Sequence, residues 1–218
     1  MYLTGIYSDS IKFGNLNKLT AYGGTDMFVL KINKEGVEVT ARKSGGAQND
    51  NSTGLITDTT GLYMVGNFNG TATFGNYSTT SYGGSDIFLV KYALENLQEQ
   101  WLKKIGSSGN DFADEITNDT NRNVMFNGTV SGTVTADTIT NSTFGATDGF
   151  VAKYNEFGDI IYAKTFGSSE NDECTGISSD FDGNTIVSAN IRNTATIDTF
   201  SISSQGERDI AVFLMDSF

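Results

Sequence analysis

Histidine and proline are absent from this chain of 218 residues, and cysteine occurs once. Without His the chain lacks the commonest general base and the commonest metal ligand. The side chains that most hydrolase mechanisms require are therefore missing. The single Cys174 excludes an intrachain disulfide framework and a cysteine-based zinc site. We expect Cys174 to be a buried free thiol rather than a nucleophile, because no His can serve as its base.

Cationic residues are also few: 14 Lys and Arg stand against 26 Asp and Glu, for a net charge of −12. No stretch gathers the cations into a stripe, which disfavours binding to nucleic acids and to anionic membranes. No apolar run approaches the roughly 20 residues that cross a bilayer. Residues 1–5 have neither the basic nor the apolar part of a secretion signal. The sequence therefore predicts no nucleic-acid partner and no membrane insertion.

A period of 61 residues organises the chain. An Asn-Asp pair recurs at 49–50, 110–111 and 171–172, and a glycine recurs at Gly45, Gly106 and Gly167. A second marker, a Gly-rich turn followed by Asp and an apolar run, recurs at Asp26, Asp86, Asp148 and Asp209. A fixed period of this size is typical of one supersecondary unit that is copied and stacked.

Each repeat has the pattern of four short strands. In the second repeat these are residues 86–92, 100–105, 113–117 and 124–130, with Gly- and Asp-containing turns between them. No segment has the amphipathic pattern of a helix of 10–15 residues. The sequence therefore predicts an all-β fold of four-stranded antiparallel meanders, stacked radially as the blades of a β-propeller. We expect the apolar first strand of each blade to be innermost and the polar fourth strand outermost.

The strand count predicts only part of a propeller, about 3.5 blades where propellers typically have 4–8. Residues 1–24 are the end of a preceding blade, residues 25–80, 85–140 and 147–200 are three blades, and residues 205–218 are the first strand of a next blade. The two ends cannot close one blade together, because the two strands between them are missing. We expect the rest of a longer chain or another subunit to complete the propeller.

Two motifs of the repeat carry a resemblance to a known family. The motifs are Gly83-Gly84-Ser85-Asp86-Ile87-Phe88-Leu89-Val90-Lys91-Tyr92 and Tyr63-Met64-Val65-Gly66-Asn67-Phe68. They resemble the SBBP β-propeller repeat of bacterial surface and secreted proteins. The resemblance covers essentially the whole chain, implies an extracellular or cell-surface location, and carries no catalytic residues. The last repeat departs from the pattern, since Gln205-Gly206-Glu207-Arg208-Asp209 lacks the double glycine, so we expect a less regular fourth unit.

The recurrent aspartates Asp26, Asp86, Asp148 and Asp209 allow two interpretations. They form either a ring of carboxylates that binds cations at one channel mouth, or structural groups that accept backbone N–H bonds and fix a turn. Recurrence in every repeat favours the structural interpretation.

The densest acidic patches contain Asp111, Asp114, Glu115, Asp172 and Glu173. These are weak candidates for a Ca²⁺ site, because hard cations require several oxygen ligands at once. Their spacing fits no complete calcium loop, so solvated loop carboxylates are the preferred interpretation.

The missing catalytic groups and the resemblance together predict a non-enzymatic interaction or scaffold module that binds a protein or a glycan at its loop face. Three alternatives stay open. They are a carbohydrate-binding propeller, an enzyme that uses the acidic ring with a metal, and a structural component of a virion or a secretion machine.

Overall fold

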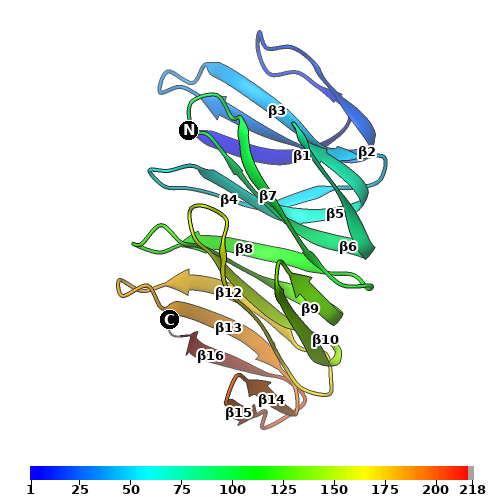
Figure 1. Cartoon of the computed structure of the whole chain (residues 1–218), viewed down its shortest axis with the longest axis vertical. Coiled ribbons are helices and arrows are strands. Elements are labelled where there is room, and N and C mark those ends of the chain that lie inside the picture. The colour runs from blue at the N-terminus through cyan, green and yellow to red at the C-terminus, as the bar shows by residue number, and fades with distance from the viewer. Residues whose placement is uncertain (216–218) are drawn as a thin grey trace.

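The computed structural model describes residues 1–215, and within that range every regular element is a β-strand. The sixteen strands pair antiparallel throughout (Figure 1), which confirms the predicted all-β class with antiparallel sheets. The described residues contain no helix that is long and apolar enough to cross a membrane. The last three residues of the predicted strand segment 205–218 lie outside the described residues.

Backbone hydrogen bonds join four consecutive strands into one antiparallel unit. The second unit consists of β4 (Asn51–Thr57), β5 (Leu62–Phe74), β6 (Tyr77–Tyr92) and β7 (Glu99–Gly106), which lie side by side in that order. The third unit repeats this arrangement with β8 (Phe112–Asn118), β9 (Val124–Ala136), β10 (Ile139–Tyr154) and β11 (Ile160–Phe166).

The units at the two ends each have three of these strands. The first unit consists of β1 (Tyr2–Ile11), β2 (Leu19–Ile32) and β3 (Glu38–Gly46). The fourth unit consists of β12 (Glu173–Ser179), β13 (Thr185–Ile191) and β16 (Asp209–Met215). Within residues 1–215, the first unit therefore lacks the strand equivalent to β4, and the fourth unit lacks the strand equivalent to β7.

This grouping corrects the predicted one. The strand that starts at Asp86 was expected at the inner edge of its blade, but β6 lies between β5 and β7 and pairs with both. β7 and β8 were expected to be neighbours in one blade, but they belong to different units. The physical reason is that residues 86–92 are buried on both faces, as in a central strand. The period fixes the length of a repeat but not the point at which one unit ends.

A short hairpin extends from the second, third and fourth units toward the preceding unit. In the second unit it is formed by residues 71–74 and 77–80, the outer halves of β5 and β6. The end of β3 pairs with it through Ser44 and Phe74, and the end of β7 pairs with the next hairpin through Ile105 and Ala136. In the fourth unit the hairpin forms separate strands, β14 (Thr194–Ile197) and β15 (Phe200–Ser203), and Gly167 bridges to Thr196. Backbone hydrogen bonds thus tie each unit to the next.

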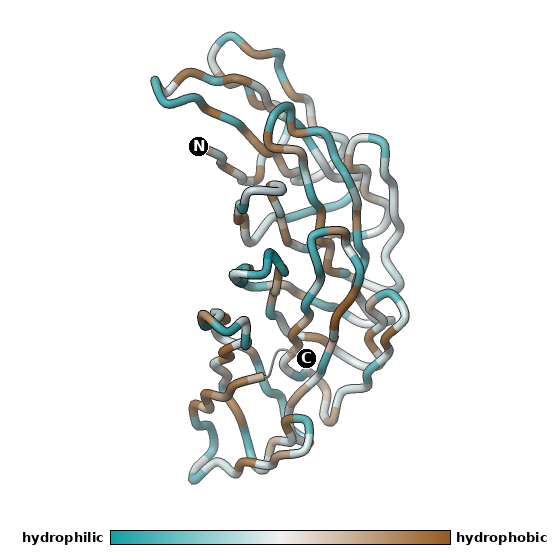
Figure 2. Tube along the Cα trace, turned by 60° about the vertical axis from the view of Figure 1, so that its left-hand side comes forward, coloured by the Kyte–Doolittle hydropathy of each residue, from teal (hydrophilic) through white to brown (hydrophobic). Residues whose placement is uncertain are grey.

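The hydrophobic cores lie between the units. Met27 of the first unit packs in one cluster with Phe74 and Phe88 of the second, and Ile87 of the second unit packs in another with Phe126 of the third. A third cluster joins the third and fourth units. Because each face of a unit is buried only against a neighbouring unit, the fold depends on stacking. The units follow one another along the long axis (Figure 1), and the trace bends into an arc (Figure 2).

Candidate functional site

The four recurrent aspartates Asp26, Asp86, Asp148 and Asp209 share one arrangement. Oδ2 of Asp86 accepts a hydrogen bond from the backbone N–H of Tyr82 at 2.8 Å, four residues earlier in the chain. The same bond links the other three aspartates to Tyr22, Phe144 and Gln205. Each carboxyl group therefore closes the turn through which the hairpin enters the third strand of its unit.

The other carboxyl oxygen faces a recurrent glycine. A Cβ atom on Gly106 would lie 2.6 Å from either carboxyl oxygen of Asp86, and Gly45 and Gly167 lie in the same way against Asp26 and Asp148. The Oδ1 atoms of these three aspartates are buried and have no hydrogen-bond partner among residues 1–215. Only a hydrogen atom fits between the backbone and the carboxyl group, which explains why Gly45, Gly106 and Gly167 recur.

A second buried aspartate accompanies each of these three. Asp111 accepts hydrogen bonds from Ser107 N–H at 2.6 Å, from Ser107 Oγ at 2.8 Å and from Ser131 N–H at 2.9 Å. Asp172 makes the equivalent bonds to Ser168 and Arg192 in the next unit, and Asp50 occupies the same position one repeat earlier. The second aspartate thus fixes the turn between two units and binds the backbone at the end of the second strand of the following unit, β5, β9 or β13.

Burial makes these carboxyl pairs sensitive to pH. Burial, reinforced by the charge of Asp111, raises the pKa of Asp86 to about 6. Burial also raises the pKa of Asp148 to about 6, with a smaller contribution from its neighbour Asp172, and it raises the pKa of Asp50 to about 6. One carboxyl group of each pair therefore changes its protonation state near pH 6.

The structure does not gather the five candidate calcium ligands into one site. Asp111 and Asp172 are buried and bound to backbone N–H groups, as described above. Oε2 of Glu115 accepts a hydrogen bond from Ile177 N–H at 3.3 Å, Asp114 is the neighbour of Glu115 on β8, and Glu173 forms an ion pair with Arg208. No three His, Cys, Asp or Glu residues lie close enough to hold one metal ion in the part of the chain that the structure describes.

The Cys174 thiol lies in the core between the third and fourth units. Its Sγ is 3.5 Å from the carbonyl oxygen of Ser188, and burial raises the pKa of Cys174 to about 11. The thiol is therefore protonated at neutral pH and has little nucleophilic character.

A set of lysine contacts that could not be predicted from the sequence joins the units. Lys153 Nζ donates to the carbonyl of Gly183 at 2.7 Å and forms a buried ion pair with Asp119 at 3.0 Å. Lys91 Nζ donates to the carbonyl of Glu156 at 2.8 Å, and Lys31 Nζ donates to that of Glu95 at 2.9 Å. The recurrence of a lysine in the third strand was visible in the sequence, but its partners in the next unit were not.

No protein-family model and no curated protein matches this chain. The resemblance to the SBBP repeat therefore stays a prediction.

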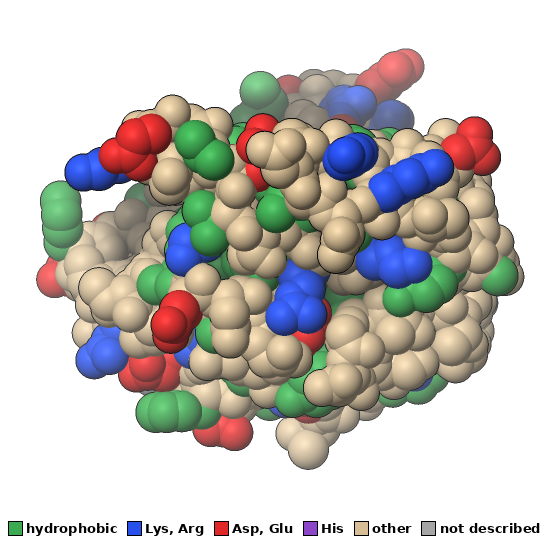
Figure 3. Space-filling view, turned by 90° about the horizontal axis from the view of Figure 1, so that it is seen from above, with side chains coloured by type: hydrophobic (Ala, Val, Ile, Leu, Met, Phe, Trp, Pro, Cys, Tyr) green, Lys and Arg blue, Asp and Glu red, His purple; other side chains and the backbone are tan. Residues whose placement is uncertain are grey.

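Among the exposed aromatic side chains, two groups lie at opposite ends of the units. Phe157 and Phe181 lie at the tips of the β10–β11 and β12–β13 loops and are 75% and 95% exposed. At the opposite end of the units, Tyr22, Tyr82 and Phe144 occupy equivalent positions and are about half exposed. Acidic and cationic side chains are interspersed on the face shown in Figure 3, without a continuous cationic stripe.

Proposed function

We propose that the chain is an arc of a β-propeller and acts as a non-enzymatic interaction or scaffold module of a bacterial cell-surface or secreted protein. The propeller is supported by the four-stranded antiparallel units, which stack face to face along a curved path (Figure 2) as blades do. The resemblance of the repeat to the SBBP family supports the location and the absence of an enzymatic role.

The observation that supports this proposal most strongly is that the recurrent polar side chains form hydrogen bonds with the backbone of the repeat units themselves. The carboxyl groups of Asp86 and Asp111 bind backbone N–H groups, and Lys91 binds a backbone carbonyl of the next unit. A group whose donors and acceptors hold the backbone is not available to a substrate. Recognition is then left to loop residues that differ from unit to unit.

The loops that join β10 to β11 and β12 to β13 supply such residues. Both loops lie at the same end of the units, because the strands alternate in direction and each loop follows an odd-numbered strand of its unit. Their tips carry Phe157 and Phe181, where the second unit has Asn96 and Thr59. Exposed aromatic side chains are typical anchors of protein interfaces. We therefore assign protein binding to this loop face.

The test compares the full chain with a Phe157→Ser, Phe181→Ser double variant. Both proteins are assayed by biolayer interferometry against immobilised bacterial envelope proteins and host matrix proteins. We expect binding to at least one protein, weakened at least tenfold in the double variant, while Phe144→Ser at the opposite end leaves it unchanged. Binding that is equally tight in all three proteins, or no protein binding at all, would contradict the proposal.

A second candidate, glycan binding, is favoured by the row of Tyr22, Tyr82 and Phe144. One aromatic ring lies at the same position in three units, and each is about half exposed. Nζ of Lys43 and of Lys104 cover one face of Tyr22 and Tyr82, 3.5 Å and 3.3 Å from the ring centroids, so stacking on these two rings would use the other face. A row of flat apolar rings offers stacking surfaces for sugar rings. A glycan array on which the chain gives signals that Tyr82→Ala weakens would support this candidate, and silence on the array would count against it.

A further inference from the structure

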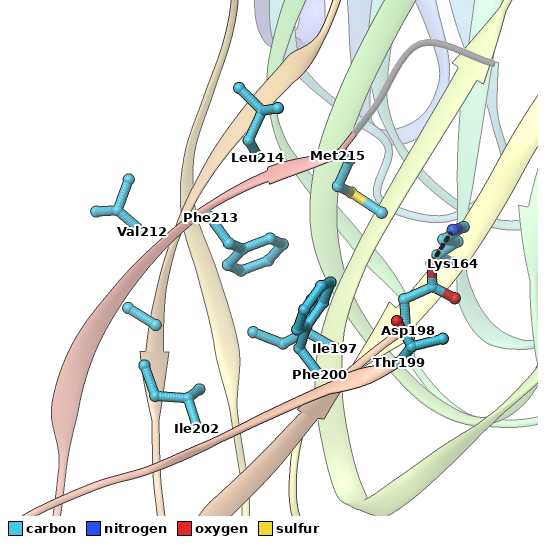
Figure 4. A pocket seen from close by; sticks show the side chains of 11 residues that line it. Lys164, Ile197, Asp198, Thr199, Phe200, Ile202, Val212, Phe213, Leu214 and Met215 are labelled. Carbon is cyan, nitrogen blue, oxygen red and sulfur yellow. Dashed lines mark hydrogen bonds and ion pairs between the residues drawn. The ribbon is translucent and has the colours of Figure 1, made fainter.

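Two pockets of the fourth unit differ in chemistry. In one of them, of about 380 Å³, Phe213 and Met215 point toward Ile197 and Phe200, so its lining is mainly apolar (Figure 4). The other, of about 270 Å³, lies between the third and fourth units and has only polar residues in its lining. We call it the polar pocket. Its residues are Thr129 and Thr147 of the third unit, Arg192 and Arg208 of the fourth, and residues 171–173 of the turn between them.

One glycine of the repeat is replaced at this boundary. In the second unit the N–H of Ser85 donates to Oδ1 of Asn110 at 3.0 Å, and a Cβ on Gly84 would lie 2.1 Å from that oxygen. The bond therefore requires glycine, and the first unit has the same arrangement. The third unit has Ala146 at this position. Its methyl group prevents the same bond to Asn171, whose side chain makes no hydrogen bond within residues 1–215 and lines the pocket instead.

A second replacement supplies a cation. At the end of the second strand, Asn69 and Ser131 bind a carbonyl oxygen of the preceding turn through their side chains, at 2.8 Å and 3.1 Å. Arg192 has this position in the fourth unit, where its backbone N–H donates to Asp172. Its guanidinium group is half-buried and has neither a hydrogen bond nor an ion pair within the described residues. A charge that has lost part of its hydration without a partner favours a bound anion.

The other charged side chains of the polar pocket already have partners. Arg208 forms an ion pair with Glu173, and Oε1 of Glu173 also accepts a hydrogen bond from Nδ2 of Asn190 at 2.9 Å. Asp172 is buried and binds backbone N–H groups. Among residues 1–215, Arg192 is therefore the one charged side chain of this pocket that is left for a ligand.

Neutral donors and acceptors line the same pocket. The hydroxyl groups of Thr129 and Thr147 and the amide of Asn171 form no side-chain hydrogen bond in the part of the chain that the structure describes. A hydroxyl group and an amide each donate and accept. A ligand that satisfies this lining has one anionic group for Arg192 and both donors and acceptors for the neutral groups.

We propose that the polar pocket binds an acidic sugar, a hexuronate unit, with its carboxylate on Arg192 and its hydroxyl groups on Thr129, Thr147 and Asn171. The guanidinium group binds a carboxylate through two parallel hydrogen bonds, and the sugar hydroxyls both donate and accept. The inference rests on the proposed interaction function and names a ligand class for its glycan-binding candidate.

Other ligands match the lining less well. A bare carboxylate, such as an acidic side chain of a protein, accepts hydrogen bonds but donates none. A phosphate brings a second negative charge beside Asp172 and Glu173. A neutral sugar leaves Arg192 without an anion. The pocket also lies at the end of the units that carries the aromatic row, since Thr147 follows Phe144 by three residues. One end of the scaffold thus presents both a carboxylate anchor and rings for stacking.

The test is an NMR titration of the ¹⁵N-labelled chain at pH 7 with D-glucuronate and D-galacturonate. D-glucose, acetate and inorganic phosphate are titrated in parallel. We expect saturable shifts of the Thr147, Asn171 and Arg192 amide signals with at least one hexuronate, and at least tenfold weaker binding of the other three compounds. No saturable shift at these amides with either hexuronate would overturn the proposal. Equally tight glucose would overturn the carboxylate contact, and equally tight acetate or phosphate would overturn the assignment to a sugar.

Two variants test the pocket itself. Arg192→Asn installs the residue that the second unit has at this position and should weaken hexuronate binding at least tenfold. Ala146→Gly restores the glycine of the repeat, which lets Asn171 bind the backbone, and should also weaken binding. Arg122→Asn is the control, because it removes the same charge in the β8–β9 loop at the opposite end of the units.

Binding that Arg192→Asn leaves unchanged, or that Arg122→Asn weakens equally, would contradict the site. Amide signals away from the pocket report whether each variant is folded. The Phe157 and Phe181 variants and Tyr82→Ala test other surfaces, so failure at Arg192 leaves the outcome of those experiments intact.

Discussion

Replacing Asp86 by Asn should change the pH dependence of folding stability in a defined direction. The Asp86 carboxyl group accepts a hydrogen bond from Tyr82 N–H, faces Gly106, and has its pKa raised to about 6 by burial and by Asp111. An unfolded Asp titrates near 3.9 (about 2 units lower). Because the folded pKa is the higher one, the protonated group contributes stability that is complete below about pH 4. This contribution is lost as the pH rises through about 6.

The size of the change in folding stability follows from the difference between the folded and unfolded pKa values of Asp86. A difference of about 2 pKa units corresponds to at most about 3 kcal/mol, at roughly 1.4 kcal/mol per unit. The carboxyl group lies near the ends of the strands, where the effective dielectric constant is higher than in a deep core, so we expect about 1–2 kcal/mol. The amide side chain of the variant would not titrate. The stability of Asp86→Asn minus that of the wild type should therefore rise by about 1–2 kcal/mol between pH 4 and pH 8.

The assay is urea unfolding of both proteins at pH values from 4 to 8, followed by the fluorescence of Trp101, which packs against the core next to Tyr63. Asp119→Asn is the matched control. Burial opposes ionisation of Asp119, but hydrogen bonds from Asn123 and Lys153 hold its pKa below the ordinary value. The stability that ionised Asp119 contributes is fully present above its unfolded pKa of about 4 and is lost only below it, so the stability difference for this variant should stay nearly flat between pH 5 and pH 8. A stability difference for Asp86→Asn that is flat, or that falls with rising pH, would refute the reasoning.

Three further predictions concern single sites. Gly106→Ala should lower the free energy of unfolding by about 1–3 kcal/mol, because its Cβ would meet the Asp86 carboxyl group, whereas Gly206→Ala, with no atom within 4 Å, should be nearly neutral in the same urea assay. Lys153→Met should lower the free energy of unfolding by about 3 kcal/mol or more, because it leaves Asp119 buried without its cation. Adding Asp119→Leu should restore part of this loss, and full additivity of the two changes would count against the buried pair. Cys174 should react with a thiol reagent at neutral pH only upon unfolding, because its pKa is raised to about 11, and rapid labelling of the native chain would be inconsistent with the described burial.

The strands were largely predictable from the sequence, and their grouping was not. The segments predicted at 86–92, 100–105, 113–117 and 124–130 fall within β6, β7, β8 and β9, because alternating turn signals and apolar runs reflect local chemistry. The hairpin at residues 71–80 was missed, since its many Thr and Ser residues resemble a loop. The division into units was wrong because a period has no starting point, and only strand pairing reveals where one unit ends.

The sequence indicated which polar residues have a structural role, but not which residues they contact. The recurrence of Asp86 and Gly106 indicated two structural positions, but their contact depends on the register of β6 against β7. The contacts of Lys91 and Lys153 depend on how one unit sits on the next, which local sequence does not specify. Residues 205–218 were predicted to form the lone first strand of a next blade, whereas β16 pairs with β13 as the third strand of the fourth unit, a placement that only strand pairing reveals.

Residue-resolved hydrogen exchange of the free chain tests the central claim most directly: the third strand of each of the first three units lies between two neighbours, whereas β16, the third strand of the fourth unit, pairs with only one strand within residues 1–215. An antiparallel strand with two neighbours has all of its amides protected, whereas an edge strand has every second amide exposed. The account predicts uniformly slow exchange along residues 87–91 of β6 and 149–153 of β10, and alternating fast and slow exchange along residues 210–214 of β16. Alternating exchange in β6, or uniformly slow exchange in β16, would contradict it.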